Sequence, residues 1–219
     1  VVDIGSRPTE YVAYTGMKHG CLSVQVPSSH MPLNFNGFKF MYPEGNGLVN
    51  EDLNRLKDIF RSEEFSEGEG ELKEMKSTSW SRYKDDLKLK AMRFSATRID
   101  KKIVIDTMGG STRDILPELL EGLGAEVIDI SDRKENMPYR DPPNPKPENL
   151  EELVETVDSN DADLGIATDM DGDRVTFYNG EFLTGDEVFS LMSRIVSGDA
   201  VASIDTSEAL EEVVEDRGN

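Results

Sequence analysis

The sequence predicts an α/β protein built from three-layer α/β/α units, each a small mixed sheet between helices. The main observation is a strand–helix–strand pattern: an apolar run at 103–105, leucine and isoleucine at helical spacing over 115–123, and a second apolar run at 127–130. This order predicts two parallel strands joined by a crossover helix. The second observation is that similar units recur along the chain, without any repeat of individual residues.

The first 75 residues predict short strands and helices. We expect strands at 1–4, 22–26 and 38–41, and helices starting near Pro8 and over 49–60. Proline suits the first turn of a helix, where its missing N–H would have no partner. Residues 61–79 are rich in Glu, Ser, Lys and Gly, and they predict a mobile, solvated connection.

The rest of the chain continues this alternation. The expected helices are 81–91, 115–123, 150–157, 184–195 and one capped by Ser207, and the expected strands are 103–105, 127–130, 164–167, 175–178 and 201–204. Asn179-Gly180 predicts a two-residue hairpin turn that leads to Phe182 and Leu183. Thr184 and Glu187 match a capping box, and Val188, Leu191, Met192 and Ile195 predict the buried face of that helix. A rigid loop spans Pro138 to Pro147.

The turn Gly109-Gly110-Ser111-Thr112 lies between an expected strand and an expected helix. Glycine-rich turns in this place can hold phosphate groups, but this one fits neither the P-loop nor the dinucleotide-binding pattern. We favour the simpler interpretation, in which glycine permits close packing of the backbone.

Residues 168–174 read Thr-Asp-Met-Asp-Gly-Asp-Arg and directly follow the apolar run 164–167. Asp169, Asp171 and Asp173 therefore alternate in a tight turn, and their charges repel each other unless a cation lies among them. Hard divalent cations prefer such oxygen ligands, so we interpret the turn as a Mg²⁺ loop with Arg174 available for an anion. A solvated acidic turn is the simpler alternative. An EF-hand is disfavoured because its sixth position would be Arg174 instead of glycine.

The composition limits the class of partner and compartment. The formal net charge is −20 and the pI is about 4.4, with acidic residues spread along the chain, which argues against nucleic acid and anionic membrane partners. Cys21 is the single cysteine, so no internal disulfide can form, and a reducing compartment is expected. There is no apolar run long enough to span a membrane and no leader pattern, so we expect a cytoplasmic protein.

The segment Ser28-Ser29-His30 lies in a loop stiffened by Pro27 and Pro32. A serine beside a histidine is on its own a weak signal of a nucleophile. The basic Lys39, just past the turn Asn36-Gly37, strengthens it.

These two segments together resemble the alpha-D-phosphohexomutase family of phosphoglucomutases, phosphomannomutases and phosphoglucosamine mutases. The family's active-site loop, T-A-S-H-N-P followed by N-G-x-K, is similar to P-S-S-H-M-P and N-G-F-K here, and its metal loop D-G-D-G-D-R is similar to D-M-D-G-D-R. Met31 replaces the usual Asn, and Pro27-Ser28 replaces Thr-Ala. Ser28 therefore adds a second hydroxyl beside Ser29, and which of the two is the nucleophile stays open from the residues alone.

The resemblance implies a role for each motif residue. Ser29 matches the serine that carries the phosphoryl group, and a phosphoserine oxygen is expected to complete a Mg²⁺ site formed by Asp169, Asp171 and Asp173. Arg174 matches an active-site arginine, and His30 and Lys39 match residues placed for proton handling or phosphate contact. The implied reaction interconverts the 1- and 6-phosphates of a hexose or hexosamine through a hexose bisphosphate, which is also the activating intermediate.

The resemblance also implies a domain organisation. We expect a partial domain I with the phosphoserine loop over 1–75, domain II with the metal loop over 76–198, and the start of domain III over 199–219. Domains III and IV, which are needed for a complete cleft around the hexose phosphate substrate, would be missing. The chain begins within an expected strand and ends where a helix-to-strand turn is expected, so we expect an incomplete chain whose segment alone is inactive.

Two alternatives remain beside the mutase. The first is a non-catalytic fragment or paralogue that binds Mg²⁺ and a phosphosugar. The second is a haloacid-dehalogenase-type phosphatase, because Asp171-Gly-Asp173-Arg-Val175 fits the opening motif of that class.

Overall fold

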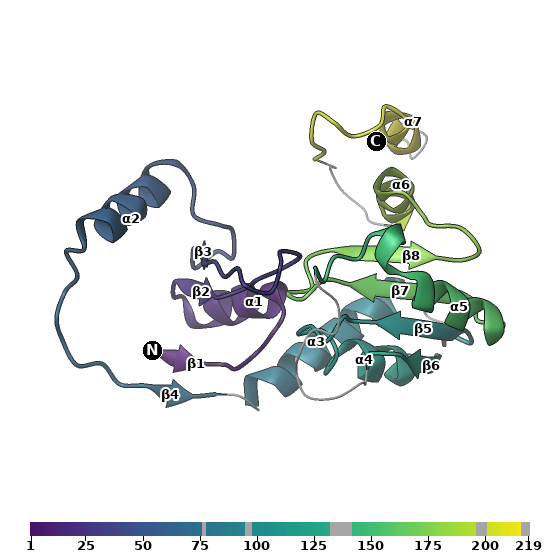
Figure 1. The fold of residues 1–219 in the computed structure, drawn as a ribbon, viewed down its shortest axis with the longest axis horizontal. Coiled ribbons are helices and arrows are strands. Elements are labelled where there is room, and N and C mark those ends of the chain that lie inside the picture. The colour runs from purple at the N-terminus through teal and green to yellow at the C-terminus, as the bar shows by residue number, and fades with distance from the viewer. Residues whose placement is uncertain (76–77, 95–97, 132–141, 196–200, 216–219) are drawn as a thin grey trace.

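A computed structural model describes residues 1–75, 78–94, 98–131, 142–195 and 201–215. Its largest element is a four-stranded sheet in the order β6-β5-β7-β8, which lies to the right in Figure 1. The strands are β5 (Lys102–Asp106), β6 (Glu126–Asp129), β7 (Leu164–Thr168) and β8 (Val175–Tyr178). β5 pairs in parallel with both β6 and β7, whereas β8 is antiparallel to β7. The predicted parallel pair and the mixed sheet are therefore confirmed.

Helices cover both faces of this sheet. Val104 belongs to a core with Leu153 and Val157 of α5 (Glu151–Ser159). Its neighbours Ile103 and Ile105 belong to a second core, against which Leu116 and Leu120 of α4 (Leu116–Gly122) pack. Because successive strand residues point to opposite faces, one apolar run supplies both cores. This is the expected three-layer α/β/α arrangement.

The contact between α5 and β7 is close. A Cβ placed on Gly165 would lie 3.0 Å from Val157 Cγ2 and 3.1 Å from Leu153 Cγ. Glycine at this position lets the helix lie directly on the strand. A short 3₁₀ helix, Pro147–Asn149, precedes α5.

The N-terminal part forms two small sheets. β1 (Val2–Asp3) pairs in parallel with β4 (Lys73–Glu74), and β2 (Ser23–Gln25) pairs antiparallel with β3 (Lys39–Met41). α1 (Thr9–His19) lies beside them, and α2 (Asn50–Ser62) stands apart without a buried residue (Figure 1).

An aromatic cluster joins this part to the rest of the chain. Tyr11 of α1 is fully buried and makes edge contacts with Trp80 and Tyr83 of α3 (Thr78–Phe94), with ring centroids 4.9 Å and 5.1 Å apart. Ile115, just before α4, completes the cluster. The Arg7 guanidinium lies 4.4 Å from the centre of the Trp80 ring. These contacts fix α1 against α3 and the segment before α4.

The capping box is confirmed. At the start of α6 (Gly185–Ile195) the Thr184 N–H donates to Glu187 Oε2 at 2.7 Å, and the Glu187 N–H donates to Thr184 Oγ1 at 3.2 Å. Each side chain satisfies a backbone N–H that the helix leaves free.

Several expectations differ from the structure. The connection expected over 61–79 contains β4 and the start of α3, because pairing with β1 fixes Lys73 and Glu74. Residues 201–204 are exposed and not a strand, since they have no strand partner in the described part of the chain. After Asn179-Gly180 only an isolated bridge joins Tyr178 to Phe182.

The apolar face of α6 was also predicted wrongly as buried. Leu191, Met192 and Ile195 are each more than half exposed. Within the described residues α6 packs against α7 (Ala209–Glu215), and this contact leaves these three side chains largely exposed. The predictions for Pro138 and for the turn at Gly218-Asn219 lie outside the described residues, as do the parts of the predicted segments at 76–77 and 196–200.

No helix among the described residues combines the length and the apolar character needed to cross a bilayer.

Leu153→Ala tests the core beneath β7. Leu153 has no exposed surface, so the substitution removes buried methyl groups and leaves a cavity. We expect it to lower the free energy of unfolding by about 2–5 kcal/mol, measured by chemical denaturation. Leu191→Ala, on the exposed side of α6, is the control and should change it by less than about 0.5 kcal/mol. Equal effects would contradict the assigned core.

Candidate active site

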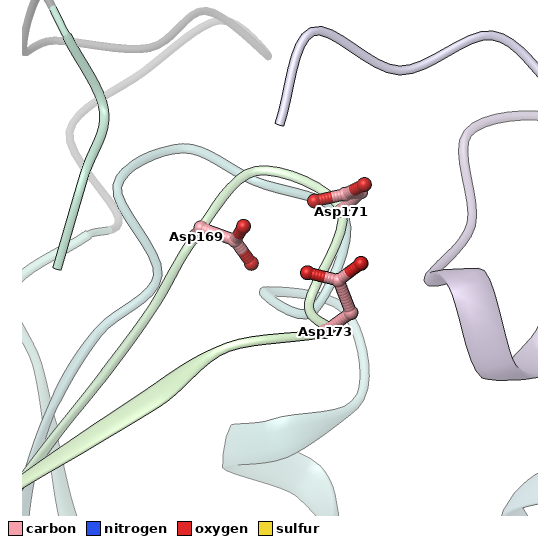
Figure 2. A group of neighbouring side chains, drawn as sticks. All are labelled: Asp169, Asp171 and Asp173. Carbon is pink, nitrogen blue, oxygen red and sulfur yellow. The ribbon is translucent and has the colours of Figure 1, made fainter. Parts of the chain in front are cut away.

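The acidic turn connects β7 to β8 and holds three carboxylates close together (Figure 2). Each of Asp169, Asp171 and Asp173 offers one oxygen, and these oxygens lie within 4.8 Å of one another. Asp169 is fully buried, Asp171 is 3% exposed and Asp173 is exposed. Gly172 has a φ of 74°, a left-handed conformation that glycine adopts without strain and that lets the chain turn between the carboxylates.

Backbone N–H groups hold the shape of this turn. Asp169 Oδ1 accepts hydrogen bonds from the N–H of Gly172 at 3.1 Å and of Arg174 at 3.2 Å. A third contact fixes the other side, where the Thr9 N–H at the start of α1 donates to the Asp171 carbonyl at 2.9 Å. The turn is thus held both by itself and by the N-terminal part of the chain.

The glycine turn after β5 packs directly against the acidic turn. The Ser111 N–H donates to the Met170 carbonyl at 2.8 Å, and the hydroxyls of Thr112 and Thr168 are 2.7 Å apart. A Cβ on Gly110 would lie 2.8 Å from Met170 Cα and 2.9 Å from the Asp169 carbonyl oxygen. The predicted close packing is therefore present. The sequence did not predict that the acidic turn is what the glycine turn packs against. Neighbouring parallel strands bring the turns that follow them to the same edge of a sheet, which could have indicated this contact.

Ser29 lies against this acidic turn from a distant part of the sequence. Its hydroxyl donates to Asp169 Oδ2 at 3.0 Å, across a separation of 140 residues, and lies 3.2 Å from His30 Nδ1. Ser29 has a φ of 50°, which is uncommon for a residue other than glycine. Ser28 lines a cavity of about 500 Å³ beside β1 and β2, and Met170 and Asp171 of the acidic turn line the same cavity. What distinguishes the Ser29 hydroxyl is its pair of contacts with Asp169 and His30.

Lys39, the first residue of β3, also reaches the acidic turn. Its ammonium group hydrogen-bonds to Asp171 Oδ2 and, at 2.6 Å, to Asp173 Oδ2. Burial lowers the pKa of Lys39, but these hydrogen bonds outweigh it and raise the pKa overall.

The electrostatics differ between the carboxylates. Burial, then the neighbouring Asp171 charge, raises the pKa of Asp169 to about 7. Burial also acts on Asp171, but the hydrogen bond from Lys39 outweighs it and lowers the pKa of that carboxyl. Asp171, which contacts the Lys39 ammonium group, therefore stays ionised to a lower pH than Asp169 does.

His30 contacts Ser29 at this site, and the Arg174 charge acts on its imidazole. Burial, and next the Arg174 guanidinium, lower the pKa of His30, so the imidazole is neutral over a wider pH range. Two further charged residues near the site were not predicted from the sequence. Lys146 adds to the effect on His30, and Glu10 has a raised pKa because of burial and the charges of Asp173 and Asp171. Neither belongs to a motif, so only the folded arrangement reveals them.

One buried oxygen of the cluster has no partner. Asp171 Oδ1 is inaccessible to solvent and makes no hydrogen bond. An unpaired buried carboxylate oxygen is costly, and it indicates a site that something else completes. A hard divalent cation fits this donor set, because all three groups offer oxygen.

The fold and the site define a class: an α/β/α protein with an acidic turn at the carboxyl edge of its sheet, faced by a serine–histidine loop. The family model for phosphoglucomutase/phosphomannomutase, alpha/beta/alpha domain II, matches residues 81–181. The chain is 32% identical to a probable phosphoglucosamine mutase of Methanothermobacter thermautotrophicus, covering 100% of this chain and 49% of that protein. It is 31% identical to a phosphoglucomutase/phosphomannomutase of Thermococcus kodakarensis, covering 100% and 50%.

Solved structures agree on the fold. A putative phosphomannomutase from Thermus thermophilus superposes with a TM-score of 0.74 at 23% identity, over 88% of this chain and 44% of the other. The chain belongs to the alpha-D-phosphohexomutase family. It spans about half the length of the curated relatives it matches.

Gly110→Ala tests the contact between the two turns. The added methyl group would collide with backbone atoms of the acidic turn, which must shift. We expect a loss of about 1–3 kcal/mol in the free energy of unfolding, together with changed NMR amide shifts for residues 169–174. Gly70→Ala, where nothing lies within 4 Å, is the control. Unchanged shifts in the acidic turn would contradict the contact.

Proposed function

We propose that the whole protein is a phosphohexomutase, an isomerase that interconverts the 1- and 6-phosphates of a hexose or hexosamine. The observation that carries this proposal is the hydrogen bond of 3.0 Å between Ser29 and Asp169 Oδ2. It places the hydroxyl of one family motif against the carboxylates of the other. A phosphoryl group on Ser29 would therefore lie at the acidic turn.

Asp169, Asp171 and Asp173, with an oxygen of phosphorylated Ser29, are the proposed ligands of Mg²⁺. A phosphoserine adds close to two negative charges beside three carboxylates, so the assembly needs a cation. When bound, the ion would offset the negative charge of phosphoryl transfer. The unpaired Asp171 Oδ1 supports this set of ligands.

The chain's own residues supply the rest of the chemistry. In the first step the bond between Ser29 Oγ and phosphorus breaks, and phosphorus bonds to a hydroxyl oxygen of the hexose phosphate, giving a bisphosphate. Lys39 or His30 takes the hydroxyl proton, and the neutral imidazole suits His30 for this task. In the second step the other phosphoryl group returns to Ser29, and the proton returns to the sugar oxygen. Arg174 provides a positive charge for the anionic groups.

The domain assignment belongs to the same proposal. Residues 1–75 would be part of domain I, 76–198 domain II and 199–219 the start of domain III. Because the chain spans about half of its relatives, domains III and IV would close the cleft around the sugar phosphate. A non-catalytic protein that binds Mg²⁺ and a phosphosugar is the second candidate.

Ser29→Ala tests the phosphoryl acceptor. After incubation of the whole protein with glucose 1,6-bisphosphate, we expect one added phosphoryl group by intact mass, and none in Ser29→Ala. Mutase activity should fall by about a thousandfold or more, because the covalent intermediate is lost. Ser28→Ala is the matched control and should retain the label.

Three outcomes would contradict this assignment. Label retained in Ser29→Ala would exclude Ser29 as the acceptor. Label released by hydroxylamine would indicate an acyl phosphate on an aspartate, as in the dehalogenase-type alternative. No label on the wild-type protein would favour the non-catalytic candidate.

Mg²⁺ should stabilise the protein through the acidic turn. At 100 times its Kd, a ligand that binds only the folded state adds about 2.7 kcal/mol to the free energy of unfolding. Asp173→Asn should lose most of this gain, whereas Asp163→Asn, at an exposed pair with Lys101, should keep it. Calorimetry with and without chelator measures both. Equal gains in the two variants would place the metal elsewhere.

A further inference from the structure

The Lys39 ammonium group lies where a cation is expected. It bonds to one oxygen of Asp171 and one of Asp173, both of which belong to the proposed metal ligands. Pairing with Gln25 across the two-stranded sheet fixes the Lys39 backbone, and its side chain spans from there to the turn. The contact therefore depends on how the N-terminal part docks on the sheet.

A lysine only partly satisfies this site. It brings one positive charge to three carboxylates, and Asp171 Oδ1 stays buried without a partner. The Asp169 oxygens are instead taken by Ser29 and by backbone N–H groups. A divalent cation brings twice the charge and can bind oxygens of all three side chains.

The ammonium group and a divalent ion cannot share the site favourably. Both would lie within a few ångströms of the same two carboxylates, and like charges at that distance repel strongly in a partly buried site. Lys39 can leave, because its side chain is 34% exposed and its stem is flexible. Asp171, at 3% exposure, cannot turn to solvent instead.

We propose that Lys39 is an internal counter-ion that occupies Asp171 and Asp173 until a divalent cation displaces it. This rests on the metal site of the proposed function. Displacement frees the ammonium group close to Ser29, where it can meet a phosphoryl oxygen or a sugar hydroxyl. Arrival of the metal and release of Lys39 for its role in phosphoryl transfer are then one event.

Binding of Mn²⁺ alone tests this exchange. The whole protein, dephosphorylated and verified by intact mass, is titrated with Mn²⁺ while the free ion is followed by electron paramagnetic resonance. Lys39→Gln should tighten the Kd about tenfold, because the ion no longer competes with a charge-assisted contact. In the absence of metal, the same variant should have a Tm about 2–4 °C lower, and saturating Mn²⁺ should remove that deficit.

Two control variants separate exchange from a general effect of charge. Lys101→Gln removes the same charge at the opposite end of the sheet, where Lys101 pairs with Asp163 at 2.6 Å. Arg174→Gln removes a charge next to the acidic turn but keeps the hydrogen bond from the Arg174 backbone N–H to Asp169. Lys101→Gln should leave the Mn²⁺ Kd within about twofold of wild type, because its charge is distant and screened. Arg174→Gln should tighten the Kd by clearly less than Lys39→Gln does, because it vacates neither Asp171 nor Asp173.

The outcomes distinguish the two proposals. Equal or weaker Mn²⁺ binding by Lys39→Gln, or an equal gain in Arg174→Gln, overturns the exchange and leaves the metal site intact. Failure of all four proteins to bind Mn²⁺ at millimolar concentration overturns the metal site as well.

Discussion

The mutual repulsion of three carboxylates in one turn is the constraint on which the rest of the structure depends. Asp169, Asp171 and Asp173 remain close only because other groups compensate them. Backbone N–H groups and the Ser29 hydroxyl bind Asp169, while Lys39 binds the other two. Both side chains come from the N-terminal part, so its docking and the charge balance of the turn depend on each other.

The sheet provides the rigid support for this arrangement. β5 and β7 are parallel neighbours, so the turns that follow them lie together at one edge. Gly110 brings the first turn into direct contact with the backbone of the second. The acidic turn therefore rests on the turn after β5, while Ser29 and Lys39 contact its carboxylates.

Local chemistry made much of this architecture predictable. The alternation of apolar runs predicted β5, α4, β6 and the parallel pairing, and the capping box at Thr184 is present as expected. The alternating aspartates marked the acidic turn, because their spacing is itself the signal. The resemblance to a known family predicted a shared site for Ser29, His30, Lys39 and Arg174.

Contacts between segments distant in the sequence were harder to predict. The bonds from Lys39 join residues more than 130 positions apart and depend on docking, which spacing does not encode. The strand expected at 201–204 and the buried face expected for α6 failed for a related reason. Both patterns are apolar, but burial requires a partner surface. In the described part of the chain residues 201–204 stay exposed, and α6 keeps most of this face exposed although it packs against α7. β4 was missed because its sequence is polar and its pairing with β1 is what makes it a strand.

The aromatic cluster at the junction has a practical consequence. Trp80 is the single tryptophan of the chain, and it lies between Tyr11, Tyr83 and the Arg7 guanidinium. Indole emission responds to solvent and to nearby charge, so this ring is an intrinsic fluorophore at the seam that brings Ser29 to the aspartates. Any hinge-like separation of α1 from α3 would change the Trp80 emission spectrum, without an added dye.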